Sequence, residues 1–218
     1  MDYYLNMKKG CSTICGELGH NIERHLLLCY YPDMKTEYQK MVCGEVYKPW
    51  DKDLKEMRGN AHKLVRMFNQ SQDNAVLKEL FQQEPENLYI EAPFYCDYGR
   101  NIEFGKNVYM NFNCTILDCA MVKIGDNTLL GPNCQIYTPC HPADAKTRIE
   151  LTEWAEPVTI GKNCWLGGNV TVLPGVNIGG NSVIGAGSVV TKNIPENSIA
   201  VGNPCKVIRI LESHDYEI

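Results

Sequence analysis

The C-terminal half of the chain repeats an apolar position every six residues. Each copy begins with an apolar residue, often has glycine second and asparagine or aspartate fourth, and carries a small or β-branched residue fifth. Six uninterrupted copies start at Ile160, Leu166, Val172, Ile178, Ile184 and Val190. Other copies start at Ile124, Leu130 and Ile136, and weaker ones start at Tyr98, Phe104, Met110 and Ile116. Such a period is typical of neither a helix nor a simply alternating strand.

A six-residue period suits a short strand followed by a sharp corner. Residues at the first and fifth positions would point inward, and the glycine and asparagine would accept the positive φ of a tight corner. Three such faces close one coil, and coils stack because each buries its apolar face only against its neighbours. The pattern therefore predicts a mainly β protein with a parallel β-helix of hexapeptide repeats over residues 90–209.

Before residue 90 the spacing of apolar residues becomes helical. In residues 51–68 one helix face is formed by Leu54, Met57, Ala61, Leu64, Val65 and Phe68. Asp53 with Glu56 resembles a capping box at its start. Shorter helices fit residues 71–83 and 36–45. We expect residues 34–89 to form a small helical domain that covers the open end of the β-helix, because exposed terminal coils aggregate. Residues 1–33 remain an unassigned extension, and residues 210–218 a tail.

The longest interruption of the repeat is a loop at residues 137–157 that contains His141, and a two-residue insertion also precedes Ile124. A long loop inside a compact domain is usually functional, and the smooth faces of a β-helix offer no pocket of their own. Pro142 directly follows His141 and can fix the turn that carries it. A lone histidine is more often structural than catalytic. Here its place in the longest break of the pattern favours a role as general base, for which imidazole is suited.

Composition and charge narrow the classes of function. The 218 residues have a net charge of −5 and a pI near 5.6, which gives no basic surface for nucleic acid or for an anionic membrane. No apolar run is long enough for a spanning helix, and the apolar piece at residues 25–31 does not resemble an export signal. We therefore expect a soluble, cytoplasmic protein.

The eleven cysteines form no CxxC pair, and most fall at single positions inside the repeats. We expect them to be reduced and to fill the core as small apolar side chains. The alternative is a metal cluster drawn from Cys11, Cys15, His20, His25 and Cys29, but their spacing fits no standard zinc site. No metal is therefore expected.

Three stretches carry a specific resemblance. They are GEVYKPWDKDLKEMR at residues 44–58, NVYMNFNCTILD at residues 107–118, and the run from CHP at residue 140 to KVIR ending at residue 209. The chain resembles the maltose/galactoside O-acetyltransferase family of hexapeptide-repeat enzymes. This resemblance implies a left-handed β-helix, a homotrimer with active sites between subunits, and acetyl transfer from acetyl-CoA to a sugar hydroxyl. The handedness comes from the resemblance alone, since general rules favour right-handed crossovers.

The resemblance also implies roles for individual residues. His141 would remove the proton of the sugar hydroxyl, and the backbone amide of Gly168 would stabilise the oxyanion. Neither a covalent intermediate nor a metal is implied. The acceptor positions match Asn111, Asp118, Asp97 and Glu153. A further acidic position of the family is Cys119 here, which leaves the identity of the acceptor open. Asn111 is equally well explained as a corner residue of the repeat.

On the donor side, the CoA arm would lie along a groove between parallel β-helices. The matching positions are Trp165, Gly168, Ala186, Thr191, Lys192, Lys206 and Arg209. Cations at the nucleotide end suit its phosphates. Trp165 is explained as well by a subunit contact, and the two lysines by simple solvation.

Other functions share parts of this pattern. A hexapeptide acetyltransferase for an antibiotic or an amine would have the same donor side. A non-enzymatic β-helix scaffold would have no need of the His-Pro loop beside the CoA run. A carbonic anhydrase of this fold would need three zinc-binding histidines in the coils, but residues 90–209 contain His141 alone.

Overall fold

The computed structural model describes residues 35–150 and 152–212. Three helices come first, α3 (Glu37–Val42), α4 (Lys52–Ser71) and α5 (Asn74–Phe81), as the apolar spacing predicts. The expected capping box at Asp53 is wrong. The N-cap of α4 is Asp51, whose carboxylate accepts hydrogen bonds from the N–H groups of Asp53 and Leu54. A capping box does form one helix earlier, between Thr36 and Gln39 of α3.

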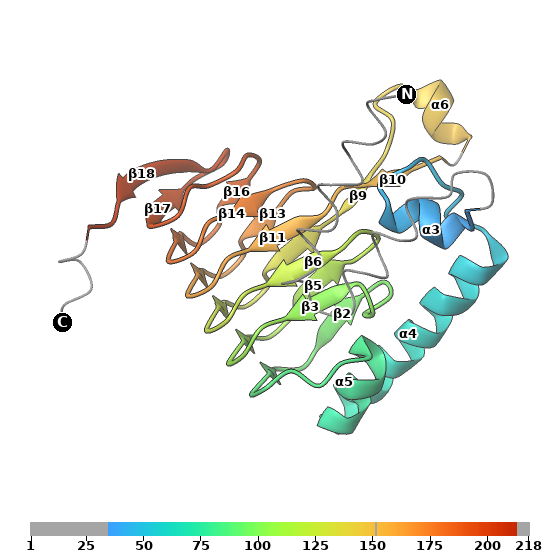
Figure 1. The fold of residues 1–218 in the computed structure, drawn as a ribbon, viewed down its shortest axis with the longest axis horizontal. Helices are drawn as coiled ribbons and strands as arrows, with labels where there is room; N and C mark the ends of the chain where they lie inside the picture. Colours follow the sequence, from blue (N-terminus) through green and yellow to red (C-terminus); the bar gives the residue numbers. More distant parts are fainter. Residues whose placement is uncertain (1–34, 151, 213–218) are drawn as a thin grey trace, which may run out of the picture.

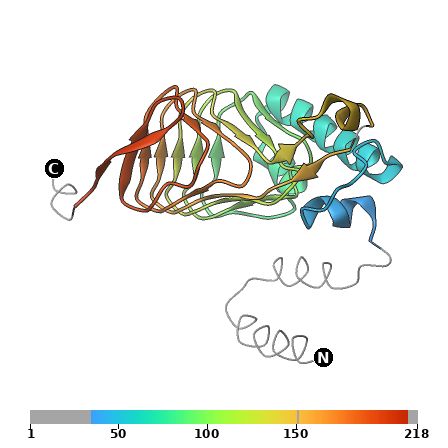
Figure 2. The same cartoon turned by 90° about the horizontal axis from the view of Figure 1, so that it is seen from above.

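The strands stack into three parallel sheets, one for each face of a β-helix (Figures 1 and 2). The first face contains β1 (Tyr89–Ile90), β4 (Tyr109–Met110), β7 (Leu129–Leu130), β12 (Trp165–Leu166), β15 (Val183–Ile184) and β17 (Ser198–Val201). The second contains β3 (Ile102–Phe104), β6 (Val122–Ile124), β11 (Val158–Ile160) and β14 (Asn177–Ile178). The third contains β2 (Phe94–Cys96), β5 (Cys114–Leu117), β8 (Gln135–Tyr137), β13 (Thr171–Val172) and β16 (Val189–Val190).

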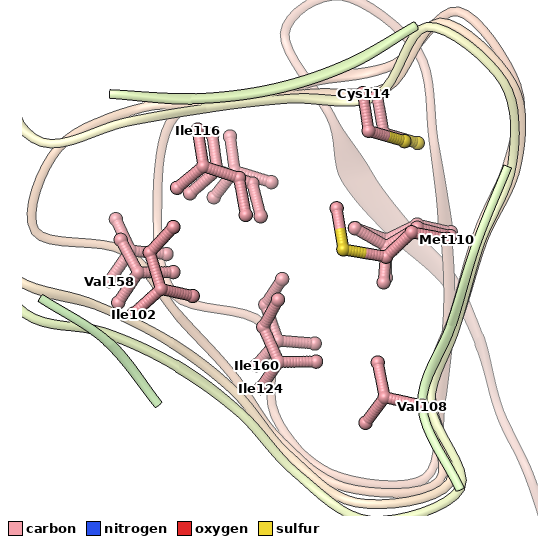
Figure 3. Close-up of a cluster of buried hydrophobic side chains, with 14 of the residues drawn as sticks. Ile102, Val108, Met110, Cys114, Ile116, Ile124, Val158 and Ile160 are labelled. Carbon is pink, nitrogen blue, oxygen red and sulfur yellow. The ribbon is translucent and has the colours of Figure 1, made fainter. Parts of the chain in front are cut away.

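The register of these strands follows the six-residue count. Trp165 pairs with Val183, eighteen positions later, as three six-residue faces require. The first and fifth positions of the repeats point inward, so that Ile160 and Cys164 are both buried. Figure 3 shows such side chains stacked inside the triangular coil. The expected β-helix is therefore confirmed.

Asparagine at the fourth position and glycine at the second position of the repeat serve different structural purposes. At the fourth position, Asn163 and Asn181 both have φ of +57°, as expected for a tight corner. Among the glycines at the second position, Gly99 has positive φ, at +73°, but Gly161 and the others do not, so that part of the expectation holds only at Gly99. They are needed for close approach, because a Cβ on Gly161 would lie 2.5 Å from the backbone nitrogen of Gly180 in the next coil.

The helices cover the open end of the β-helix. The Phe81 ring of α5 meets Phe94 and Phe104 of the first coil edge-on, at centroid distances of 5.9 Å and 4.9 Å. The side-chain amide of Asn69 donates to the carbonyl oxygen of Phe94 and accepts from its N–H, at 2.9 Å and 2.8 Å. Gln83 does the same for β3, contacting the backbone of Ile102 and Phe104. The side-chain amides of Asn69 and Gln83 thus make hydrogen bonds that the backbone of a preceding coil would otherwise make.

The other end of the solenoid closes differently from the expectation. After Gly202 the chain turns back, and β18 (Lys206–Ile210) pairs antiparallel with β17. Lys206 and Arg209 therefore lie on a returning strand rather than in a further coil, because the six-residue count has already ended. In the part of the chain described, no helix is long and apolar enough to cross a membrane.

The cysteines inside the coils behave as expected. Those at positions 96, 114, 119, 134, 164 and 205 are buried free thiols, and Cys140 is a partly exposed one. Cys43 is disulfide-bonded, so the expectation of reduced cysteines is wrong there; it follows α3 and is not part of a repeat. The alternative cluster around Cys11 and His20 lies outside the described residues.

Candidate active site

The loop that interrupts the repeat folds back onto the helical cap. It leaves the coil after β8, forms β9 (Pro139–Cys140), the short helix α6 (Ala145–Ile149) and β10 (Trp154–Ala155), and returns at β11. β9 and β10 pair antiparallel, which gives the loop a rigid base. Figure 1 shows β9, β10 and α6 on the same side as α3, and α3 contacts β10.

A bridge between Tyr47 and Glu153 fastens the loop to the cap. The N–H of Tyr47 donates to the carbonyl oxygen of Glu153 at 3.0 Å, and the reverse bond is 3.4 Å long. The phenol of Tyr47, which is 1% exposed, donates to one carboxylate oxygen of Glu153. Burial raises the pKa of Tyr47 far above its ordinary value, so the phenol stays protonated and remains a donor.

A cavity of about 470 Å³ opens between the cap, the third face of the β-helix and the loop. Its polar lining consists of Arg58, Asp97, Cys119, His141, Arg148 and Glu153. Its apolar lining consists of Pro49, Trp50, Leu117 and Pro139. The volume is that of a site for a small molecule, and its walls come from segments far apart in the sequence.

His141 and Glu153 face each other in this cavity. The Nε2 atom of His141 lies 3.6 Å from the Oε2 atom of Glu153. The imidazole side chain is 55% exposed, whereas that of Glu153 is only 11% exposed. Since Tyr47 holds the other oxygen of Glu153, the carboxylate has a fixed direction. This is the arrangement of a histidine oriented by an acid, with its ring open to a substrate.

Asp97 and Cys119 also line the cavity. The Cys119 thiol lies 3.7 Å from Oδ2 of Asp97, whose Oδ1 is 3.9 Å from Nε2 of His62. Burial raises the pKa of Asp97, and the positive charges of His62 and Arg58 oppose that rise. Burial and then the Asp97 carboxylate raise the pKa of Cys119, so it is present as a thiol. The position where the resemblance implies an acid is thus filled by a neutral, weak hydrogen-bonding group.

Asp118 does not contact the cavity, contrary to the expectation. It is 0% exposed, and its carboxylate accepts hydrogen bonds from the N–H groups of Asp97, Tyr98 and Asn101 at 3.0, 2.8 and 3.3 Å. Burial raises its pKa to about 8, against the opposing effect of these donors. Asp118 instead holds the turn that presents Asp97, a role that its spacing alone could not reveal.

The expected donor-side residues lie elsewhere on the molecule. Trp165 is 56% exposed on the first face, and Gly168 and Ala186 lie at the same corner of adjacent coils. Neither these three residues nor Asn111 belongs to the described lining of the cavity. The side-chain oxygen of Asn111 accepts the N–H of Phe112 at 2.8 Å, as a corner residue does. One chain therefore brings His141, Asp97 and Glu153 together, but not the donor positions.

Three cavity residues, and Tyr47, which holds Glu153, were not found by sequence reasoning. Tyr47, Trp50 and Arg58 come from the cap, and Arg148 comes from α6. The first three lie within residues 44–58, a stretch noted only for its resemblance. A cluster of aromatic and basic residues just before a helix was the available signal. Among the described residues, no group of three or more His, Cys, Asp or Glu side chains is placed to hold a metal ion.

Comparisons with known proteins agree with this architecture. The hexapeptide repeat of succinyl-transferase matches residues 121–138 and 157–192, and the maltose acetyltransferase hexapeptide capping motif matches residues 40–84. The galactoside O-acetyltransferase of Escherichia coli is 42% identical over 183 residues, which cover 81% of this chain and 90% of that protein.

Two solved structures extend the comparison to the fold. A maltose O-acetyltransferase from Clostridium difficile has a TM-score of 0.80 at 45% identity, covering 82% of this chain and 98% of that one. A hexapeptide-repeat acetyltransferase from Vibrio cholerae, solved with acetyl-CoA, has a TM-score of 0.77 at 34% identity, covering 82% of this chain and 100% of that one. The chain therefore belongs to the maltose and galactoside O-acetyltransferase family of hexapeptide-repeat acetyltransferases.

Proposed function

We propose that this acetyltransferase moves the acetyl group of acetyl-CoA to a hydroxyl group of a sugar. The observation that carries the proposal is the His141–Glu153 pair in the wall of a cavity of small-molecule size. Two relatives, the galactoside O-acetyltransferase of Escherichia coli and the maltose O-acetyltransferase of Clostridium difficile, support a sugar as acceptor. The acetyl-CoA bound to the Vibrio cholerae relative supports the donor.

In the proposed reaction His141 acts as general base. It takes the proton of the acceptor hydroxyl while the oxygen attacks the thioester carbonyl of acetyl-CoA. Glu153, at 3.6 Å, stabilises the imidazolium that forms. The tetrahedral intermediate collapses with cleavage of the C–S bond, and the imidazolium returns the proton to the leaving thiolate. The products are the acetylated sugar and CoA, and no atom of the protein is acylated.

The donor side requires a second copy of the chain in this proposal. Trp165, Gly168 and Ala186 form a neighbouring set on the β-helix surface, outside the described lining of the His141 cavity. A homotrimer of parallel β-helices would place this surface of one copy against the loop of the next. Gly168 would then offer its amide to the oxyanion. Thr191, Lys192, Lys206 and Arg209 would lie toward the nucleotide. A monomer in light scattering at micromolar concentration would contradict this arrangement.

The activity is tested by the release of CoA thiol from acetyl-CoA with a panel of acceptors. We expect turnover with simple galactosides or glucosides and almost none with the His141→Ala variant. A panel of amines and aminoglycoside antibiotics is run in parallel, because the carboxylates of Asp97 and Glu153 could also receive an ammonium group. Rapid acetylation of the amines with no turnover of the sugars would replace the sugar proposal by an N-acetyltransferase.

A further inference from the structure

Trp50 occupies an unusual place for a large apolar side chain. It is 61% exposed, yet it lines the same cavity as His141. A single exposed aromatic residue is common on protein surfaces and needs no explanation by itself. Here the exposed ring stands in the wall of the candidate site, between the cap and the catalytic loop. Whether the Trp50 ring can bind a ligand depends on how firmly its neighbours fix its position.

Arg58 holds the tryptophan without covering it. The guanidinium carbon of Arg58 lies 5.7 Å from the ring centroid of Trp50 and 5.7 Å from that of Tyr98. Arg58 also donates to the carbonyl oxygen of Pro49, the residue before Trp50, at 3.0 Å, and to the phenol of Tyr98 at 2.8 Å. Tyr98 is itself fixed, because its N–H is bound by the buried Asp118. The exposed ring therefore has a rigid support.

The cavity lining combines apolar and polar side chains. The exposed surface of the lining is mainly apolar, with Trp50, Leu117 and Pro139 among its contributors. His141 and Asp97 are among its polar residues. A pyranose ring also combines the two kinds of surface, since its C–H groups form an apolar face and its hydroxyls project from the rim. An aromatic ring beside polar groups recognises such a molecule from both sides.

We propose that Trp50 is an acceptor-specificity residue, whose ring stacks on the apolar face of a pyranoside and turns a hydroxyl toward His141. Arg58 is the positioning residue that fixes the ring. The inference rests on the proposed sugar acetylation and adds which acceptors are favoured: cyclic sugars that offer a continuous C–H face over flexible linear polyols. The chemistry of acetyl transfer is unchanged.

The test compares variants of Trp50 in the full-length protein. With methyl β-D-galactopyranoside as acceptor, Trp50→Ala should raise the acceptor KM about tenfold, the expected loss for one aromatic contact. Trp50→Phe, which keeps an aromatic face, should recover most of that loss, whereas Trp50→Leu should not. The KM for acetyl-CoA should stay within twofold. With galactitol, a linear polyol, Trp50→Ala should have little effect.

Met67→Ala is the matched control. Met67 is an exposed apolar residue of α4, the helix that begins two residues after Trp50, and it is not part of the cavity lining. This variant should leave both KM values unchanged. Binding of the galactoside is also measured by tryptophan fluorescence, and the signal should disappear in Trp50→Phe although Trp154 and Trp165 remain.

The outcomes separate this inference from the function on which it rests. An unchanged galactoside KM in Trp50→Ala, with normal wild-type turnover, overturns the role of Trp50 and leaves sugar acetylation standing. Equal losses with galactoside and galactitol also overturn it, because stacking on a ring face cannot explain them. Failure of the wild-type protein to acetylate any sugar overturns the proposed function, and the inference with it.

Discussion

Replacing Tyr47 by phenylalanine removes one hydroxyl that fixes the acid beside His141. The phenol donates to Glu153 inside a buried bridge, and a hydrogen bond to a charged group contributes about 1.5–3 kcal/mol. Phenylalanine fills almost the same volume, and the two backbone bonds between residues 47 and 153 can persist. The substitution therefore affects mainly the orientation of the Glu153 carboxylate. If the whole of this hydrogen-bond energy were lost from the stabilisation of the transition state, kcat would fall by about 10-fold to about 150-fold. We expect the lower end, because the bridge keeps the loop in place.

The assay measures kcat and both KM values by thiol release, and the free energy of unfolding by urea titration. We expect a lower kcat with an unchanged KM for acetyl-CoA, because the donor positions lie outside this cavity. Tyr38→Phe is the control, since it also removes a part-buried phenol, one that donates to Asn101 at 2.8 Å. It should reduce stability by about 1 kcal/mol and leave kcat unchanged.

A double-mutant cycle decides whether Tyr47 acts through Glu153. In a Glu153→Gln background, Tyr47→Phe should have much less effect on kcat than in the wild-type protein. Two fully additive effects would refute the idea that the phenol orients the acid. A wild-type kcat in Tyr47→Phe would refute the whole line of reasoning, whatever happens to stability.

Three further changes test other parts of the site. His141→Ala should lower kcat by about two to four orders of magnitude with little change in acetyl-CoA affinity by calorimetry, and more than a tenth of wild-type turnover would remove it from the mechanism. Cys119→Asp should improve kcat/KM for simple sugars several-fold, because an ionised hydrogen-bond partner replaces a thiol. An unchanged kcat/KM for these sugars would count against a sugar as the acceptor. Asp97 holds its proton more tightly when folded, so its contribution to the unfolding free energy should fall as the pH rises from about 4 through its raised pKa. Urea titrations across this range should show that Asp97→Asn abolishes that part of the slope, and an unchanged slope would mean that burial does not control this carboxyl.

The β-helix could be read from the sequence because its rules are local. Every coil needs inward side chains at fixed positions. Apolar or small residues that recur at these positions, as Ile160 and Cys164 do, therefore predict the fold. The exception is instructive. Glycine at the second position looks like a corner residue, but Gly161 is required by the backbone of the next coil. A single repeat contains no information about how closely its neighbour approaches.

The candidate site was only partly readable, for a different reason. His141 stood out because it lies where a strict pattern stops. Tyr47 and Trp50 belong to no repeat, and Glu153, the partner of Tyr47, lies about a hundred residues away in the sequence. Asp118 shows the reverse difficulty. An acid at an expected acceptor position could either face a substrate or bind backbone N–H groups, and only its burial decides between the two.

The bridge between Tyr47 of the cap and Glu153 of the loop limits where the number of coils can change during evolution. On the third face, β2, β5 and β8 lie between the cap and the start of the loop. Duplication of one coil in this segment would move His141 and Glu153 about 5 Å away from Tyr47 and Trp50, which would break the bridge and divide the cavity. Duplication of a coil beyond the loop would lengthen the solenoid without affecting that contact. Natural variation in coil number should therefore be confined to the C-terminal side, while the distance from cap to loop stays constant.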